Sequence, residues 1–117
     1  MTNPISTVWI VAPIVAVFAI EPAAAAQTGV ASWYRPSSGM KTANGEKFNA
    51  KEKTCAHRSV DFGAHVKVTD LKTGRSIVCR VNDRGPFERG RIVDLNPASA
   101  HALGIEGTAR VRIEKIR

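Results

Sequence analysis

Two short polar segments of this 117-residue chain each place one carboxyl group in a tight, glycine-containing turn. In the first, Asn44-Gly45 favours a turn with a positive φ angle and presents Glu46 at the loop tip. In the second, Gly85-Pro86 stops a strand and holds Asp83 at its end. Two carboxyl groups across a cleft can cleave a glycosidic bond, one donating a proton to the leaving oxygen while the other stabilises positive charge on the anomeric carbon.

The residues themselves also allow a structural role, in place of a catalytic one, for both carboxyl groups. Glu46 can be a solvated surface side chain, and Asp83 can pair with a nearby arginine to hold its loop. Three arginines lie close enough in sequence for that pairing: Arg80, Arg84 and Arg91.

The segments around these loops are typical of short strands. Residues 66–70 alternate apolar and polar side chains, and the turn at 72–74 leads into residues 77–81, which predicts a β-hairpin. Residues 109–114 alternate strictly, which predicts a closing strand that buries Ala109, Val111 and Ile113.

One short helix is predicted between the strands. Asn96 is a good N-cap, Pro97 suits the first helical position, and Gly104 is placed to end the helix. About six short strands with one helix indicate a mostly β domain, and a closed barrel would protect the sheet edges of so small a chain.

The first 26 residues are typical of a secretory signal. An uncharged apolar run, 8–20, is shorter than the roughly twenty residues that span a bilayer, and alanines 23–26 resemble a cleavage site. We expect one mature domain, residues 27–117, that is periplasmic or secreted, monomeric and without a stable membrane anchor. An uncleaved anchor remains an alternative, because no basic residue precedes the apolar run.

Export bears on the cysteines and on the charge. Cys55 and Cys79 are the two cysteines of the chain, so an oxidising compartment predicts a disulfide between them, with two buried thiols as the alternative. They and the histidines lack zinc-ligand spacing, so no metal and no cofactor are expected.

After residue 26 there are seventeen Lys and Arg and nine Asp and Glu, which indicates a polyanionic partner. Outside a cell this favours lipid headgroups or an acidic wall over nucleic acid.

Several ordered motifs resemble the double-psi β-barrel domain of the rare lipoprotein A family. The resemblance covers 29 to about 113 and includes these segments: 31–34, 42–49, 56–57, 62–63, 68–71, 81–87, 90–95 and 103–104. It implies a six-stranded double-psi β-barrel that acts on bacterial peptidoglycan. Active members are lytic transglycosylases, which cut between N-acetylmuramic acid and N-acetylglucosamine and leave a 1,6-anhydro end.

The resemblance implies Glu46 and Asp83 as the catalytic carboxyl groups, and it places His57 beside them, where its imidazole can hydrogen-bond a carboxyl or a sugar hydroxyl. The carboxyl that carries the proton needs a raised pKa, and the sequence does not rank the two. The expected substrate-binding residues are aromatic, amide and cationic: Trp33, Tyr34, Asn44, Asn82, Arg84 and Arg91.

The chain departs from the family in two ways. It has neither the lipid-attached cysteine nor the C-terminal peptidoglycan-binding domain of many members, so a lipoprotein is not expected. Two other functions stay open beside the enzyme: an expansin-like module that binds or loosens glycan without cutting it, and a secreted inhibitor of another protein.

Overall fold

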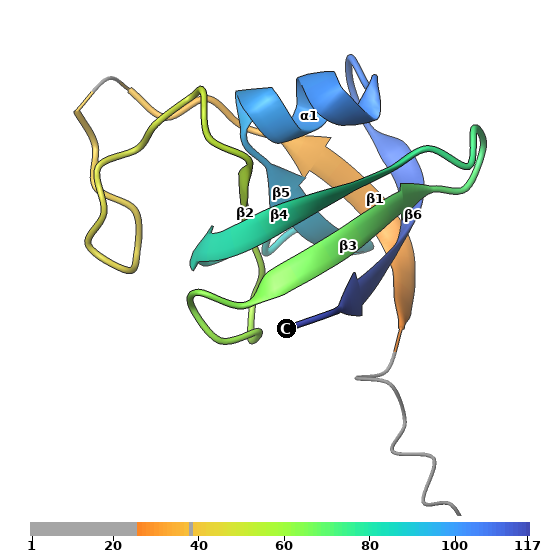
Figure 1. Ribbon diagram of the computed structural model, residues 1–117, viewed down its shortest axis with the longest axis horizontal. Helices are drawn as coiled ribbons and strands as arrows, with labels where there is room; N and C mark the ends of the chain where they lie inside the picture. The colour runs from red at the N-terminus through yellow and green to blue at the C-terminus, as the bar shows by residue number, and fades with distance from the viewer. Residues whose placement is uncertain (1–25, 38) are drawn as a thin grey trace, which may run out of the picture.

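The computed structural model describes residues 26–37 and 39–117. The predicted secretory signal, residues 1–26, therefore lies outside the described residues apart from Ala26. Within the described residues, six strands and one helix follow one another (Figure 1). Their bounds are β1 Gln27–Trp33, β2 Thr54–Ala56, β3 His65–Asp70, β4 Ser76–Asp83, β5 Arg91–Leu95, α1 Pro97–Leu103 and β6 Ala109–Lys115.

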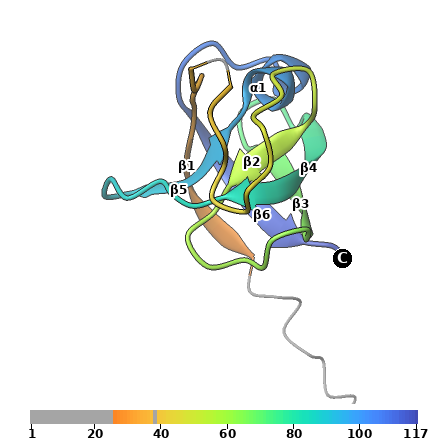
Figure 2. The same ribbon diagram turned by 90° about the vertical axis from the view of Figure 1, so that its left-hand side faces the viewer.

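The six strands close into a barrel in the order β1-β5-β2-β4-β3-β6, as two perpendicular views show (Figures 1 and 2). The β1–β5 and β2–β4 pairs are parallel, and the other four pairs are antiparallel. Closure pairs every strand of the described barrel on both sides. This confirms the expectation of a mostly β, six-stranded closed barrel with one short helix.

The local predictions from side-chain alternation are confirmed. In the β3–β4 hairpin, Val66 is opposite Cys79 and Val68 is opposite Ile77. On β6, Val111 and Ile113 are buried and Ala109 is partly buried against them. These side chains join an apolar core inside the barrel, because alternate residues of each strand face inward.

Helix α1 begins and ends as predicted. The Asn96 side chain accepts a hydrogen bond from the Ser99 amide at 3.0 Å, Pro97 occupies the first turn, and Gly104 ends the helix at φ 79°. Within residues 26–37 and 39–117, no helix is long and apolar enough to cross a lipid bilayer.

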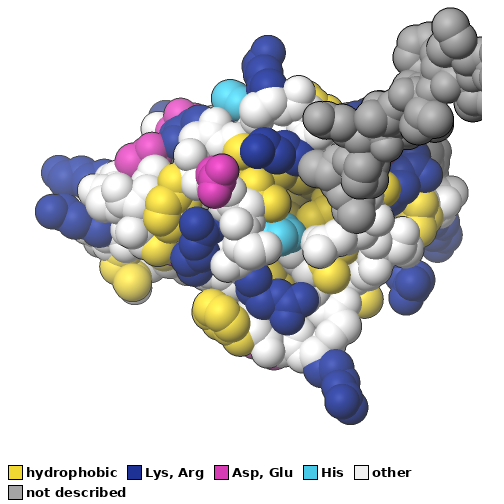
Figure 3. Space-filling view, turned by 90° about the horizontal axis from the view of Figure 1, so that it is seen from below, with side chains coloured by type: hydrophobic (Ala, Val, Ile, Leu, Met, Phe, Trp, Pro, Cys, Tyr) yellow, Lys and Arg dark blue, Asp and Glu magenta, His cyan; other side chains and the backbone are white. Residues whose placement is uncertain are grey.

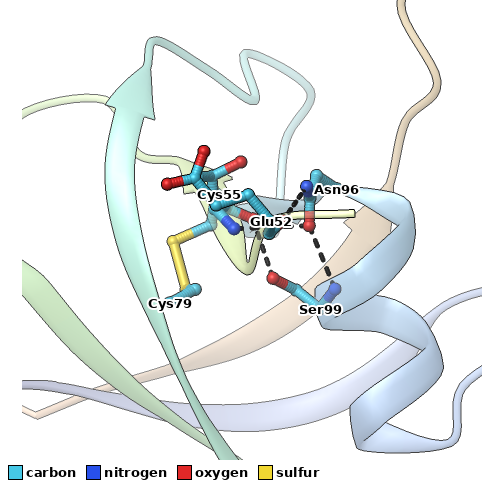
Figure 4. The surroundings of a disulfide bond; sticks show 6 residues. Glu52, Cys55, Cys79, Asn96 and Ser99 are labelled. Carbon is cyan, nitrogen blue, oxygen red and sulfur yellow. Dashed lines mark hydrogen bonds between the residues drawn. A yellow bond between two sulfur atoms is a disulfide. The ribbon is translucent and has the colours of Figure 1, made fainter. Parts of the chain in front are cut away.

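The predicted disulfide is present and lies near the capping residue of α1 (Figure 4). Cys55 and Cys79 are both fully buried and join β2 to β4. The buried Asn96 side chain donates to the Asn49 carbonyl at 3.1 Å and also to the Glu52 carbonyl. Asn96 therefore fixes the loop that precedes β2 at two points, the carbonyls of Asn49 and Glu52.

The surface is basic over a wide area. Figure 3 shows Lys and Arg side chains scattered over the visible part of one face, with few acidic side chains among them. A polyanion that contacts this face would meet attraction over most of its length.

Candidate active site

A row of four residues crosses four neighbouring strands. Ser32 on β1 is the register partner of Asp94 on β5, Asp94 is the partner of Ala56 on β2, and Ala56 is the partner of Asp83 on β4. Register partners point to the same face of a sheet, so both carboxyl groups lie on one side of the barrel wall. The small side chain of Ala56 lies between them.

A bulge on β4 turns Asp83 toward this face. Cys55 pairs with Val81, but the next residue of β2, Ala56, pairs with Asp83, so Asn82 is the additional residue. Without it, strand alternation would place Asn82 in the row and turn Asp83 to the other face. The Gly85–Pro86 peptide bond, which is cis, ends the polar segment predicted from the sequence.

Asp94 is a site residue that the sequence did not single out. It is half-buried, and the Ser32 hydroxyl donates a hydrogen bond to its Oδ1. Burial raises the pKa of the Asp94 carboxyl, and the nearby Glu88 and Asp83 carboxylates raise it further against the opposing effects of Ser32 and Arg91. A carboxyl that keeps its proton more readily than usual is suited to acid catalysis.

Asp83 accepts three hydrogen bonds. The Tyr34 hydroxyl donates to Oδ2 at 3.1 Å, and the amides of Ala43 and Arg84 donate to Oδ1 at 3.0 and 2.9 Å. Burial raises the pKa of Tyr34, and the Asp83 charge beside it raises that pKa further, so the phenol keeps its proton and remains a donor. Asp83 is thus held in one orientation by donors from three segments.

Glu46 forms a two-point ion pair. Arg80 on β4 donates to both carboxylate oxygens, at 2.5 and 2.9 Å, and Asn44 Nδ2 donates to Oε1 at 2.8 Å. The Arg80 guanidinium lowers the pKa of Glu46 to about 2, so Glu46 is ionised near neutral pH. Arg80 therefore pairs with Glu46, not with Asp83 as one reading of the sequence allowed.

The turn that carries Glu46 also contacts the Asp83 strand. The Asn44 amide donates to the Asn82 carbonyl at 3.2 Å, and the neighbouring Ala43 amide binds the Asp83 side chain. Gly45 has φ 89°, which confirms the turn with positive φ predicted at Asn44-Gly45. The two predicted carboxyl groups are thus brought to one loop–strand junction.

His57 is buried, and both ring nitrogens have protein partners. Its Nε2 lies 2.9 Å from the Gln27 side-chain oxygen, and its Nδ1 accepts from the Ser59 and Val60 amides at 3.1 and 3.0 Å. Burial lowers the pKa of this imidazole. Its link to the site within the described residues is through the main chain: the His57 amide donates to the Asp83 carbonyl at 3.2 Å.

Tyr34 lines a hollow of about 290 Å³ that contains Asp83. Trp33, the adjacent residue, is on the other side of the strand and lines a different hollow with His101. Adjacent residues of an extended chain point to opposite sides, so of the two rings only Tyr34 lines the hollow that contains Asp83.

The remaining predicted binding residues contact the protein itself. Asn44 and Asn82 both donate to Glu46, at 2.8 and 3.4 Å, and the Asn82 side chain is buried. Arg84 donates to the carbonyls of His57 and Val60, while Arg91, at the start of β5, acts on Asp94 through its charge. A substrate would have to displace or share these contacts.

Comparisons with known proteins agree with this architecture. A family described as lytic transglycolase matches residues 26–114. A probable endolytic peptidoglycan transglycosylase RlpA of Synechocystis is 53% identical over 81 residues, which are 68% of this chain and 25% of that protein. The endolytic peptidoglycan transglycosylase RlpA of Neisseria meningitidis is 46% identical over 93 residues, 77% of this chain and 39% of that protein. The chain thus spans well under half the length of these curated relatives.

Two solved structures share the fold. A Streptomyces papain inhibitor has a TM-score of 0.63 at 22% identity, covering 82% of this chain and 98% of its own. A mutant expansin of Clavibacter michiganensis, solved in complex with cellohexaose, has a TM-score of 0.63 at 19% identity, covering 79% of this chain and 50% of its own. The sequence and family matches confirm the predicted double-psi β-barrel, and the chain belongs to the lytic transglycolase family, in the group of RlpA-like domains.

Proposed function

We propose that this domain is a peptidoglycan lytic transglycosylase that acts outside the cytoplasm, cutting glycan strands and leaving a 1,6-anhydro end. The observation that carries the proposal is the row in which Asp83 and Asp94 flank Ala56, because the two carboxyl groups differ in environment. One is half-buried with a raised pKa, and the other is held by three donors. The relatives named peptidoglycan transglycosylases support the choice of substrate.

In the proposed mechanism Asp94 carries the proton. As an acid it protonates the bridging oxygen while the bond from that oxygen to the anomeric carbon breaks. As a base it then takes the proton of the sugar's own 6-hydroxyl, whose oxygen forms the new bond to the anomeric carbon. No water is consumed, and Asp94 ends in the state in which it began.

Asp83 and Glu46 act as charges in this proposal. Asp83, oriented by Tyr34 and two amides, stabilises positive charge that develops on the anomeric carbon. Arg80 keeps Glu46 ionised, so we assign its negative charge a share in stabilising the same positive charge on the anomeric carbon. The turn that carries Glu46 also binds Asp83 through the Ala43 amide. His57 is a positioning residue, because its amide fixes the Asp83 main chain.

The test compares the wild type with Asp94→Asn, Asp83→Asn and Glu46→Gln on glycan strands with and without stem peptides. The removal of the proton carrier should lower the rate by about 10²–10⁴-fold. Thermal unfolding of each variant separates a catalytic effect from a folding defect. Full activity of folded Asp94→Asn would reject its assignment, and no cleavage of either glycan by the wild type would reject the enzyme.

A module that binds glycan without cutting it is the second candidate. The observation that favours it is the shared fold with the expansin bound to cellohexaose. If the wild type binds glycan strands but releases no product, this candidate replaces the enzyme.

A further inference from the structure

The hollow that contains Asp83 continues into a second hollow of about 640 Å³. The two share Arg35, Pro36 and Phe48 in their walls, so they form one groove. Phe48 stands at the junction, with its ring centroid 6.1 Å from that of Tyr34 and tilted by 49°. Tyr34 in turn binds Asp83, so a sugar over Phe48 would adjoin the sugar at the proposed site of cleavage.

The ionisable side chains that line the second hollow are both cationic. They are Arg35 and Lys51, and both are exposed. Neither has an ion-pair partner among residues 26–37 and 39–117. Their charges are therefore available to a ligand in the groove.

The nearest acidic neighbours in sequence are already paired. Glu52, next to Lys51, binds Arg80 at 3.0 Å, and Glu46, two residues before Phe48, binds the same guanidinium at 2.5 Å. Arg80 thus pairs with both acids of this loop region and offsets part of their charge, and neither acid lines the second hollow, whose ionisable residues are cationic.

The loop that carries Lys51 is fixed before any ligand arrives. The Lys51 amide donates to the Asn49 side chain at 3.0 Å, which closes a local turn. The fully buried Asn96 side chain binds the carbonyls of Asn49 and Glu52, on either side of Lys51. A fixed backbone lowers the entropy cost of binding at this position.

From this arrangement we propose that Arg35 and Lys51 form a subsite for a carboxylate carried by the glycan, one sugar away from the bond that is cut. The inference rests on the proposed function for the nature of the glycan. Two sources supply such a carboxylate in peptidoglycan: the muramoyl carboxyl itself in strands without stem peptides, and the peptide carboxyls in strands that carry them. A neutral glycan lacks this contact and would be held by the aromatic rings alone.

The test measures equilibrium binding separately from cleavage. The wild type, Arg35→Gln, Lys51→Gln and the double variant are titrated with peptide-free strands, with the same strands after amidation of their carboxyl groups, with peptide-bearing strands, and with a neutral chitin oligosaccharide. Lys67→Gln, which removes an exposed lysine on β3, is the matched control for the net charge of each single variant. Arg35→Lys tests whether the charge alone is sufficient.

The double substitution should weaken binding of carboxylate-bearing strands by about 5- to 10-fold, with the loss reduced at high salt. It should raise KM with little change in kcat, leave chitin binding unchanged and keep the melting temperature. Amidation of the strands should weaken their binding to the wild-type protein by the same factor. The substitutions should cause the larger loss with either the peptide-free or the peptide-bearing strands, and that strand identifies the source of the carboxylate. Lys67→Gln should bind like the wild type.

Equal binding of native and amidated strands, or an unchanged Kd in the double variant, would overturn the subsite. If that happens while the wild type still cleaves, the proposed function stands and this inference fails. If binding depends on the carboxylate but no product forms, the subsite stands and the proposed enzyme fails.

Discussion

Asp83 and Asp94 lie on opposite sides of the same residue, Ala56, as its register partners on the two neighbouring strands. Strand spacing places the backbones of the two acids about 10 Å apart. The alanine between them is buried, with 2% of its surface exposed, so its small side chain is packed between the two acids. The two carboxyl groups are close enough for the charge of Asp83 to raise the pKa of Asp94.

The small, buried side chain of Ala56 is the subject of the first prediction. Ala56→Leu should lower the rate of glycan cleavage by at least about tenfold, because the added atoms would displace the carboxyl groups that flank this position. The rate is measured as release of soluble glycan fragments. Ala98→Leu, on α1, adds the same atoms away from the site and should keep the rate. Equal activity of both variants would show that cleavage does not depend on the spacing of the two acids around Ala56.

The second prediction concerns the pH dependence of cleavage. Asp94 must be protonated to act as the acid, so the rate should fall as the pH rises through its raised pKa. The Ser32 hydroxyl stabilises the ionised form of Asp94. Ser32→Ala should therefore raise the pKa of Asp94 further and move the alkaline limb of the pH–rate profile up by about one pH unit.

The stability of Asp94→Asn provides a separate check, because this variant should lose activity without losing stability. Because the pKa of Asp94 is higher in the folded than in the unfolded chain, the folded state loses stability as the pH rises above the ordinary pKa of an aspartate. Asp94→Asn removes that charge, so it should melt at the same or a higher temperature at pH 7 while losing activity. A large drop in melting temperature would assign Asp94 to the fold instead.

The third prediction concerns Glu46 and acid stability. Since its folded pKa is about 2 against 4.5 for the free side chain, the stability it contributes is present above pH 4.5 and is lost as the pH falls toward 2. The pair is more than a third exposed on the Glu46 side, so Glu46→Gln should cost only up to about 1 kcal/mol at pH 7. Urea unfolding at pH 7 and pH 2 measures this, and the difference from the wild type should vanish at pH 2.

The fourth prediction concerns His57. Burial lowers its pKa from 6.5, so the fold favours the neutral ring and the stability from this group is lost as the pH falls below 6.5. His57→Gln should reduce the dependence of the melting temperature on pH between about 6.5 and 5. A nuclear magnetic resonance titration of the His57 ring that gives a pKa at or above 6.5 would contradict this account.

The fifth prediction concerns the disulfide between Cys55 and Cys79. The bridge joins residues 24 apart, and a loop of that size corresponds to about 3 kcal/mol of stability. Cys55→Ala with Cys79→Ala should lower the free energy of unfolding by about that amount, with some further loss from packing in the core. Urea unfolding of the oxidised wild type and the double variant tests this, and equal midpoints would contradict it.

The parts of the fold that follow from local patterns were predictable from the sequence. Alternation identified the β3–β4 hairpin and β6, and the Asn96, Pro97 and Gly104 signals placed α1 within its observed bounds. The parallel pairs were not predictable from such patterns, because β1 meets β5 and β2 meets β4 across long stretches of chain. Here the resemblance to a known family supplied what local patterns lacked.

The site was predictable only in part for the same reason. Glu46 and Asp83 stand in turns with recognisable residues, whereas Asp94 lies within a regular strand whose sequence gives no sign of its chemistry. Its raised pKa depends on burial and on Asp83, and its hydrogen-bond partner Ser32 is 62 residues away in the chain. The pairing of Arg80 with Glu46, which spans 34 residues, was equally hidden.

The most direct test of the central claim is mass spectrometry of the new glycan ends formed in water enriched in oxygen-18. A proton carrier that lets the sugar's own 6-hydroxyl attack predicts 1,6-anhydro ends with no oxygen-18, formed by the wild type and reduced at least about a hundredfold in Asp94→Asn. New reducing ends that carry oxygen-18, or no new ends from any peptidoglycan preparation, would contradict the account.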